Sequence, residues 1–254
     1  MIRPRIIPGL LIRDRGLVKT VKFRNEKYIG DPLNAVRIFN EKGADEIIIF
    51  DIDASVQNSE PDFSLIEKIA RQSRMPVCYG GGVKSAETAQ KILKLGVEKI
   101  ALSSLFFENV KIVSEMIINL GSQSVVLVLD VKRNKEDQYS VYLHNGTVEM
   151  GDNLLSVISK AEETGVGEII INSIDKDGTM EGYDMALLEK VCSATSLPLS
   201  FIGGAGSLDD IKKIIEKHGN VGVAAGSLFV YCDSKKAVLI NYPSKEEKNK
   251  LFNY

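Results

Sequence analysis

The sequence predicts one α/β domain of the (β/α)8 TIM-barrel class, and three observations support this prediction. The first is size, because 254 residues with 44% hydrophobic content can bury the core of such a domain. The second is an alternation of eight short apolar, β-branched segments with segments of helical spacing. The third is a repeat of motifs half a chain length apart. An open, doubly wound sheet shows the same alternation but has no reason to repeat at its midpoint.

The expected strands are nearly continuous apolar runs, which is typical of parallel strands covered on both faces. They lie at residues 5–12, 46–52, 76–79, 99–102, 124–131, 168–172, 199–202 and 221–225. Between them, apolar residues at helical spacing predict helices at 33–41, 64–70, 88–95, 110–118, 154–164, 185–191 and 211–215. Glycines such as Gly43, Gly96 and Gly165 fall where a helix should end.

One segment departs from this alternation. Residues 139–150 alternate as a strand pair would, and they contain His144-Asn145-Gly146-Thr147. Asn-Gly is the strongest short-range signal for a two-residue hairpin turn. We therefore expect a β-hairpin after the fifth strand that rises above the catalytic face.

The repeat pairs four segments of the first half with four of the second, and one pair is residues 48–53 with residues 170–175. Tyr79-Gly80-Gly81-Gly82 corresponds to Phe201-Ile202-Gly203-Gly204, and Ser104-Leu105-Phe106 corresponds to Ser227-Leu228-Phe229. The expected first and fifth strands also correspond, which places Leu11 opposite Asp130. We therefore predict a single domain over residues 1–254, built of half-barrels at about 1–120 and 121–254.

The composition excludes several classes of function. Lys and Arg total 32 against 34 Asp and Glu, so no basic excess favours a nucleic-acid partner. Cys78, Cys192 and Cys232 form no CxxC motif or disulfide framework, which indicates a reducing compartment. The two histidines, His144 and His218, are far apart and argue against zinc or a Ser-His-Asp triad. We expect a cytoplasmic protein with no membrane segment, metal or cofactor.

Glycine-rich turns follow the third and seventh expected strands, at Gly80-Gly81-Gly82 and Gly203-Gly204-Ala205-Gly206. Turns without side chains let backbone N–H groups approach an anion closely. Ser103-Ser104 and Gly226-Ser227 follow the fourth and eighth strands and would add hydroxyl groups and helix N-termini. The alternative is that these glycines only permit tight turns. The repeated arrangement favours two phosphate sites and a ligand with a phosphate at each end.

Carboxylates also follow the expected strands. Asp130 stands within the apolar run 125–131, where an acid is costly unless it has a task. Asp51, Asp53, Asp175 and Asp177 could act in acid–base chemistry or could only form turns and helix caps. Lys19 and Lys132 could neutralise phosphate.

Charged residues mark the opposite face of the predicted barrel. Four strands begin at residues of alternating sign, which are Arg5, Glu46, Lys99 and Glu168. These side chains would form a closed ring of ion pairs at the base of the barrel. The alternative is a simple polar cap on the surface.

Many collinear motifs resemble one family. They include Arg5-Ile6-Ile7, Gly30-Asp31-Pro32, Asp130-Val131-Lys132-Arg133 and Ser173-Ile174-Asp175-Lys176-Asp177-Gly178. Over nearly its full length the chain resembles the cyclase (HisF-type) subunit of imidazole glycerol phosphate synthase. The resemblance implies a (β/α)8 barrel with a glutaminase docked on its bottom face. Ammonia would pass up the barrel to a bis-phosphorylated ribulosyl substrate, which is cleaved and cyclised.

The resemblance fails at one catalytic position. Asp130 matches one of the two catalytic aspartates of the family, but the other position is Leu11, within Gly9-Leu10-Leu11-Ile12. Asp14 is the nearest acid and is out of register with that position. A leucine cannot transfer a proton, so we do not expect ordinary cyclase (lyase) activity.

The other implied site positions are present. The charged gate for ammonia would be Arg5, Glu46, Lys99 and Glu168, Glu98 would face the glutaminase, and Lys19 and Asp51 would lie on substrate loops. The implied phosphate-binding residues are Gly81, Gly82, Ser103, Ser104, Asp177, Gly178, Gly203, Gly204, Gly226 and Ser227.

One branch of the family shares the openings Arg5-Ile6-Ile7-Pro8 and Gly16-Leu17-Val18-Lys19-Thr20, namely the HisF-like proteins associated with glycosyl amidation (WbuZ-type). This resemblance implies an ammonia conduit that works with a HisH-like glutaminase. A sugar amidotransferase would use the ammonia to amidate a surface-polysaccharide sugar. The alternatives are a genuine cyclase of histidine biosynthesis and a non-catalytic regulator that binds a phosphorylated ligand.

Overall fold

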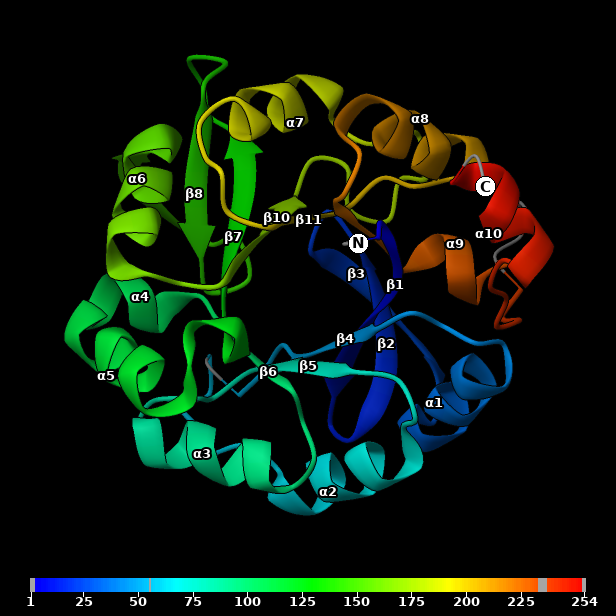
Figure 1. Ribbon diagram of the computed structural model, residues 1–254, viewed down its shortest axis with the longest axis horizontal. Helices are drawn as coiled ribbons and strands as arrows, with labels where there is room; N and C mark the ends of the chain where they lie inside the picture. Colours follow the sequence, from blue (N-terminus) through cyan, green and yellow to red (C-terminus); the bar gives the residue numbers. More distant parts are fainter. Residues whose placement is uncertain (1–2, 55, 233–236, 253–254) are drawn as a thin grey trace.

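Eight parallel strands form a closed barrel that is surrounded by helices (Figure 1). The computed structural model describes residues 3–54, 56–232 and 237–252. The barrel strands are β1 (Arg5–Arg13), β4 (Ile47–Asp51), β5 (Val77–Gly80), β6 (Lys99–Leu102), β7 (Val125–Arg133), β10 (Glu168–Ser173), β11 (Leu199–Ile202) and β12 (Gly222–Ala225). Parallel pairing of β12 with β1 and of β7 with β10 closes the barrel. The (β/α)8 prediction is confirmed.

The helices cover the outside of the barrel, as Figure 1 shows. They are α1 (Pro32–Glu41), α2 (Phe63–Gln72), α3 (Ala86–Lys94), α4 (Ser104–Glu108), α5 (Val110–Leu120), α6 (Leu154–Thr164), α7 (Met185–Cys192), α8 (Leu208–His218), α9 (Ser227–Val230) and α10 (Lys245–Leu251), with a 3-10 turn at Ser122–Ser124. The sequence did not predict α4, α9 and α10, because each is too short to show helical periodicity. Helix α8 extends beyond the expected 211–215, since a capping box at Ser207 starts it earlier.

The core has two layers, because side chains of the barrel strands alternate inward and outward. The larger layer packs the outer face of the strands against the helices. The smaller layer fills the barrel interior and consists of Ile7, Ile48, Cys78, Ala101, Val126, Val128, Ile170, Ile202 and Ala224. The interior between the two ends of the barrel is therefore packed with apolar and small side chains.

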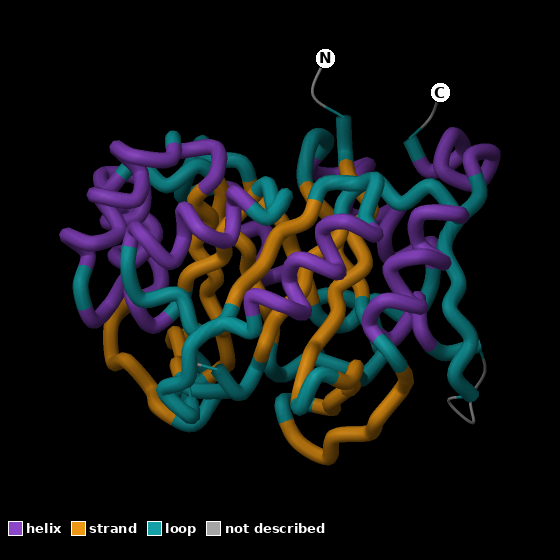
Figure 2. Tube along the Cα trace, turned by 90° about the horizontal axis from the view of Figure 1, so that it is seen from below, coloured by secondary structure: helices purple, strands orange, loops and turns teal. Residues whose placement is uncertain are grey.

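Two β-hairpins extend from the barrel, and Figure 2 shows strands protruding at one end of it. β8 (Tyr139–Leu143) and β9 (Val148–Asn153) form the hairpin that the sequence predicts after β7. The expected two-residue turn is wrong, because residues 144–147 form the turn and His144, Asn145 and Gly146 all have positive φ. This turn also contacts the barrel rim, since Asn145 Nδ2 donates to Ile52 O at 2.9 Å.

The other hairpin was not predicted. It consists of β2 (Gly16–Val21) and β3 (Arg24–Gly30), which follow β1 directly. β3 is exposed along most of its length, so its sequence lacks the apolar alternation by which a half-buried strand is recognised.

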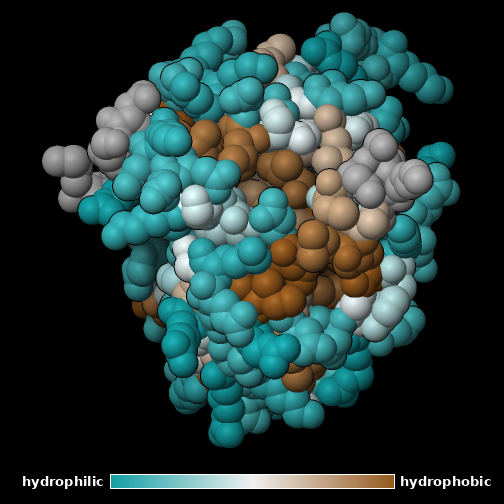
Figure 3. All heavy atoms as spheres, turned by 90° about the vertical axis from the view of Figure 1, so that its right-hand side faces the viewer, coloured by the Kyte–Doolittle hydropathy of each residue, from teal (hydrophilic) through white to brown (hydrophobic). Residues whose placement is uncertain are grey.

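The face of the molecule that carries α9 and α10 is mostly hydrophilic (Figure 3). Figure 3 looks onto the side of α9 and α10 and shows apolar surface gathered within hydrophilic surroundings. The segment between these helices contributes two exposed apolar side chains, Val238 and Leu239. No helix in the described parts of the chain is long and apolar enough to cross a membrane.

Candidate functional site

A cavity of about 300 Å³ opens at the carboxyl ends of the barrel strands. It brings together most of the residues that the sequence predicts for this face, which are Leu11, Lys19, Asp51, Gly81, Gly82, Ser103, Ser104, Asp130, Asp177, Gly178, Gly203, Gly204, Gly226 and Ser227. Asp53, Lys132, Asp175 and Gly206 do not line it: Asp53 pairs with Arg13, and Asp175 Oδ2 accepts from Arg133 N. The carboxyl face is where (β/α)8 barrels place their sites.

Asp130 lies near the end of β7 and points into this cavity. Its Oδ1 accepts a hydrogen bond of 2.9 Å from Nδ2 of Asn172, its neighbour on β10. Burial raises the pKa of Asp130 to about 7; the bond from Asn172 opposes this shift and the charge of Asp177 adds to it. The Asp130 carboxyl can therefore both give and take a proton near neutral pH.

Leu11 lines the same cavity from β1, beside Phe50 of β4. Asp14 does not replace the missing carboxylate, because it lies exposed at the turn between β1 and β2 and does not line the cavity. The backbone of Asp14 has a φ of 47°, which suits that turn.

Three further acids line the cavity, and each already has local partners. Glu26 pairs with Arg13, and Asp51 Oδ1 accepts from the N–H groups of Asp53 and Ala54. Asp177 Oδ2 accepts from Thr20 Oγ1 at 2.8 Å. In the described part of the chain, no three His, Cys, Asp or Glu side chains are grouped so as to hold a metal ion.

The two glycine-rich turns need glycine for steric reasons. Gly81 has a φ of 131°, and a Cβ there would lie 2.5 Å from the carbonyl oxygen of Asp51. Gly204 has a φ of 112°, and a Cβ there would lie 2.3 Å from the carbonyl oxygen of Gly182. Both turns border the cavity, so their backbone is open to a ligand in each half of the barrel.

The short helices α4 and α9 begin beside these turns. Ser103 and Gly226 occupy their N-cap positions, and neither makes a side-chain cap hydrogen bond. The first N–H groups of each helix therefore lack the usual side-chain acceptor. This arrangement suits an anion that lies between the glycine turn and the helix in each half.

The β2–β3 hairpin covers part of the cavity. Lys22 N donates to Asp177 O at 2.9 Å, and Phe23 N donates to Asp177 Oδ2 at 3.3 Å. Lys19 of β2 is 5% exposed, and its Nζ would lie 2.0 Å from a Cβ placed on Gly226. Burial lowers the pKa of Lys19, and the charge of Asp177 opposes this effect. The hairpin thus places a cationic side chain at the turn after β12.

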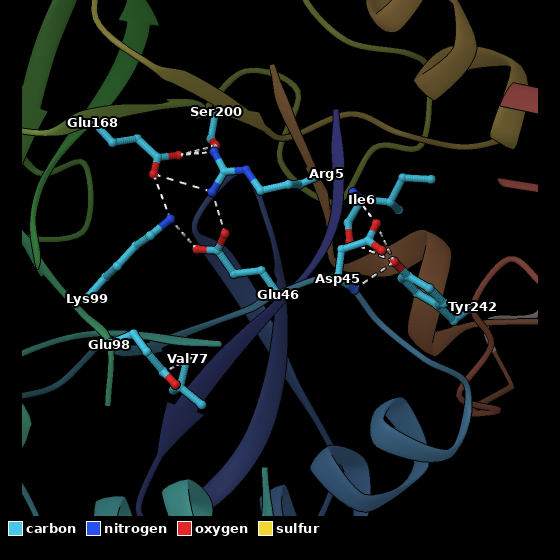
Figure 4. Close-up of polar contacts among 10 residues, drawn as sticks. All are labelled: Arg5, Ile6, Asp45, Glu46, Val77, Glu98, Lys99, Glu168, Ser200 and Tyr242. Atoms are coloured by element: carbon cyan, nitrogen blue, oxygen red, sulfur yellow. Dashed lines mark hydrogen bonds and ion pairs between the residues drawn. The ribbon is translucent and has the colours of Figure 1, made fainter. Parts of the chain in front are cut away.

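At the opposite end of the barrel, four charged side chains form a closed ring (Figure 4). Arg5 pairs with Glu46 and, at 2.7 Å, with Glu168. Lys99 Nζ lies 2.9 Å from Glu46 and 2.8 Å from Glu168. Ser200 Oγ donates to Glu168 and adds a neutral member to the ring. The ring that the sequence suggests therefore exists as a geometric feature.

The ring is charged despite its burial. Burial alone would lower the pKa of Arg5 and Lys99, but the nearby carboxylates of Glu168 and Glu46 raise both values above the ordinary ones. Burial would raise the pKa of Glu168, but Arg5 and Lys99 bring it below its usual value. Attraction within the ring therefore outweighs desolvation.

Glu98 lies exposed next to the ring. Its Oε2 accepts a 2.7 Å hydrogen bond from Val77 N, and Figure 4 shows this pair beside the ring. Glu98 thus holds the start of β5, a local role that the sequence does not reveal because residues 77 and 98 meet only in the folded barrel.

Several residues of the cavity were not foreseen from the sequence, among them Asn172 on β10 and Thr20, Phe23 and Glu26 of the β2–β3 hairpin. Asn172 is 8% exposed and directly follows the apolar run Ile169-Ile170-Ile171 of β10, two residues after the inward-facing Ile170. A polar residue inside a buried run is the same signal that identified Asp130.

The closed barrel and its cavity define a (β/α)8-barrel protein whose site lies at the carboxyl face. A family model described as "Histidine biosynthesis protein" matches residues 5–235. Among known proteins, the chain is 54% identical to "Putative imidazole glycerol phosphate synthase subunit HisF" of Leptospira borgpetersenii, over 99% of this chain and 100% of that protein. It is 51% identical to "Putative imidazole glycerol phosphate synthase subunit hisF3" of Vibrio vulnificus, over 98% and 96%.

The chain is also 35% identical to "Imidazole glycerol phosphate synthase subunit HisF" of Streptococcus mutans, over 94% of this chain and 97% of that protein. The chain belongs to the HisF-type imidazole glycerol phosphate synthase subunit family.

Proposed function

We propose that the protein is an ammonia conduit that accepts ammonia from a HisH-like glutaminase and supplies it for amidation of a surface-polysaccharide sugar. The observation that carries this proposal is the combination of an intact charged ring at the base with Leu11 at the mouth. The ring is retained where ammonia would enter, while one of two proton-transferring groups is missing where cyclisation would occur.

We assign the ammonia source to a separate subunit. Burial raises the pKa of both Cys78 and Cys192, so neither thiol is an activated nucleophile for glutamine hydrolysis. The relatives are named as subunits of a synthase, which supports a partner at the base of the barrel. Glu98 is exposed beside the ring and carries the charge that we assign to this interface.

The barrel interior suits ammonia rather than ammonium. Between the ring and the mouth lie apolar side chains and the small residues Cys78, Ala101 and Ala224. A cation would lose its hydration there without compensation, whereas neutral ammonia pays a much smaller penalty. The ring is closed by four ion pairs, so entry requires one of them to open. We expect Lys99 to move, because its Nζ donates only to Glu46 and Glu168, whereas Arg5 also donates to Ser200.

The second candidate is a genuine cyclase subunit of histidine biosynthesis. Asp130 and both glycine turns border the cavity, which supports binding of a bis-phosphorylated ligand. The cyclase activities of wild type and of Leu11→Asp separate the two functions. A genuine cyclase is active with Leu11 in place, whereas a conduit gains cyclase activity only when the variant restores a carboxylate at the cavity. A regulator that only binds a phosphorylated ligand would not need the closed ring.

The partner is tested by co-purification with the HisH-like glutaminase encoded alongside this chain. We expect a complex at micromolar concentrations, weakened by Glu98→Lys. Glu98→Gln should also weaken the complex, though less, because it removes the charge but keeps an oxygen that can accept from Val77 N; it thereby separates the role of the charge from that of the β5 hydrogen bond. Lys99→Ala should change the ratio of ammonia delivered to glutamine hydrolysed. If wild-type chain and glutaminase form no complex, the conduit proposal fails.

A further inference from the structure

The base of the barrel has a seam where β1 begins ahead of its neighbour β4. Pairing between the two strands starts at Gly9 and Ile48, so β4 supplies no register partner for Ile6. Ile6 is completely buried, and a buried backbone N–H or C=O group without a partner is costly. Groups from outside β4 therefore have to satisfy the Ile6 backbone at this seam.

Two side chains satisfy the Ile6 backbone. Ile6 N donates to Asp45 Oδ2 at 3.0 Å, and Ile6 O accepts from the Tyr242 hydroxyl at 2.8 Å (Figure 4). The same hydroxyl accepts from Asp45 N at 3.2 Å, so the three residues form one connected network. Tyr242 precedes α10 and lies 236 residues from Ile6 along the chain. The C-terminal segment thus closes the seam between the first two barrel strands.

Packing fixes the position of the Tyr242 hydroxyl. The side chain is 4% exposed, and its ring meets Phe39 of α1 edge-on with the ring centroids 6.3 Å apart. Phe229 of α9 packs on it with the centroids 5.4 Å apart. Lys248 of α10 adds a 2.8 Å bond from its Nζ to Asp45 Oδ1. A hydroxyl that is held from several sides can set the position of the strand that it binds.

The network is joined through the backbone to the charged ring. Arg5 and Ile6 are consecutive residues, and so are Asp45 and Glu46. Arg5 pairs with Glu46 in the ring, while Ile6 packs in the outer core layer and its backbone binds Asp45. Figure 4 shows these two contacts side by side. A shift of the start of β1 against the start of β4 would therefore disturb both contacts together.

We propose that Tyr242 and Asp45 are positioning residues of the charged ring, which fix the start of β1 against the start of β4 and so keep Arg5 paired with Glu46. The C-terminal segment is then a working part of the base of the barrel, although it contributes no side chain to the ring. A role in ammonia entry rests on the proposed conduit, whereas the positioning of the ring does not.

The test compares two tyrosine variants of the purified chain by hydrogen exchange, followed by NMR. Tyr242→Phe removes the hydroxyl and keeps the packed ring. Exchange of the Asp45 amide should become about tenfold faster, as expected for one lost hydrogen bond. Exchange of the Arg5 guanidinium and Lys99 ammonium hydrogens should become at least about twofold faster, as expected for groups coupled through packed contacts. Tyr183→Phe is the matched control and should change none of these rates, because the Tyr183 hydroxyl is also buried but donates at 2.8 Å to a different strand carbonyl, Ala224 O.

The exchange rates of the ring hydrogens decide the outcome. Faster exchange at Asp45 with Arg5 and Lys99 unchanged would mean that Tyr242 only anchors the C-terminal segment, and it would overturn the proposal. Equal effects of the two tyrosine variants on the ring would overturn it as well. Lys248→Met is a milder change, since it removes only the ammonium group that binds Asp45. It should speed exchange in the ring by a smaller factor, and no increase there would also count against the proposal.

A second readout uses the complex with the glutaminase. Tyr242→Phe should shift the ratio of ammonia delivered to glutamine hydrolysed in the same direction as Lys99→Ala, whereas Tyr183→Phe should leave this ratio at the wild-type value. Hydrogen exchange is measured on the chain alone, so the positioning of the ring and the proposed conduit can each fail without the other.

Discussion

The Asp130→Asn variant should gain stability relative to wild type as the pH rises. Burial raises the pKa of Asp130 from 3.8 to about 7 in the folded state. The folded state therefore holds this proton more tightly than the unfolded state, and the group costs stability as pH rises through this range. Over the whole range the cost is up to about 4 kcal/mol, because each pKa unit corresponds to about 1.4 kcal/mol. Water in the cavity reduces that value.

The assay is urea unfolding of wild type and Asp130→Asn at about pH 5 and about pH 8. The free energy of unfolding of the variant minus that of wild type should increase by up to about 2.5 kcal/mol between the two pH values. Asp152→Asn is the control, because it makes the same substitution at an exposed position of β9 that does not line the cavity. A constant difference between wild type and Asp130→Asn at both pH values would refute the reasoning.

Three further predictions concern the turns, the ring and the hairpin. Gly204→Ala should lower the affinity for inorganic phosphate at least about tenfold and destabilise the fold by about 1–3 kcal/mol, because the added Cβ would clash with backbone atoms. Gly151→Ala is the control for backbone strain alone, because Gly151 also has a positive φ but no atom lies near the added Cβ. Glu168→Gln should cost about 3 kcal/mol in urea unfolding at neutral pH, and this cost should shrink as pH falls through the lowered pKa of Glu168, because the ionised form is what stabilises the fold. Asp177→Asn should speed hydrogen exchange at the amide of Phe23, which donates to the Asp177 carboxylate; unchanged exchange would contradict the docking of the β2–β3 hairpin.

Sequence patterns revealed the barrel because its strands are buried on both faces and the two halves repeat. The same repeat placed Leu11 opposite Asp130 and predicted both glycine turns, which border one cavity in the structure. The charged ring could also be foreseen, since the ends of parallel strands meet at one face of a barrel. These features depend on chain order and strand direction alone.

Other features depend on contacts between distant segments. The exposed strand β3 shows no periodicity, so its hairpin and the docking on Asp177 became visible only in the structure. The bond from Val77 N to Glu98 likewise needs the folded barrel. The network of Tyr242 with Ile6 and Asp45 joins the two ends of the chain, which no residue pattern contains.

The most direct measurement of the central claim uses the purified chain with its glutaminase, glutamine labelled with 15N at the amide, and the bis-phosphorylated ribulosyl substrate of the cyclase reaction. Glutamate release and 15N-labelled imidazole product are followed together. We expect the complex to hydrolyse glutamine. Formation of the imidazole product should be absent, or slower than in an ordinary cyclase by a factor of ~10²–10⁴, because that is the usual loss when one acid–base group is missing. Cyclisation at ordinary rates with Leu11 in place would contradict this expectation.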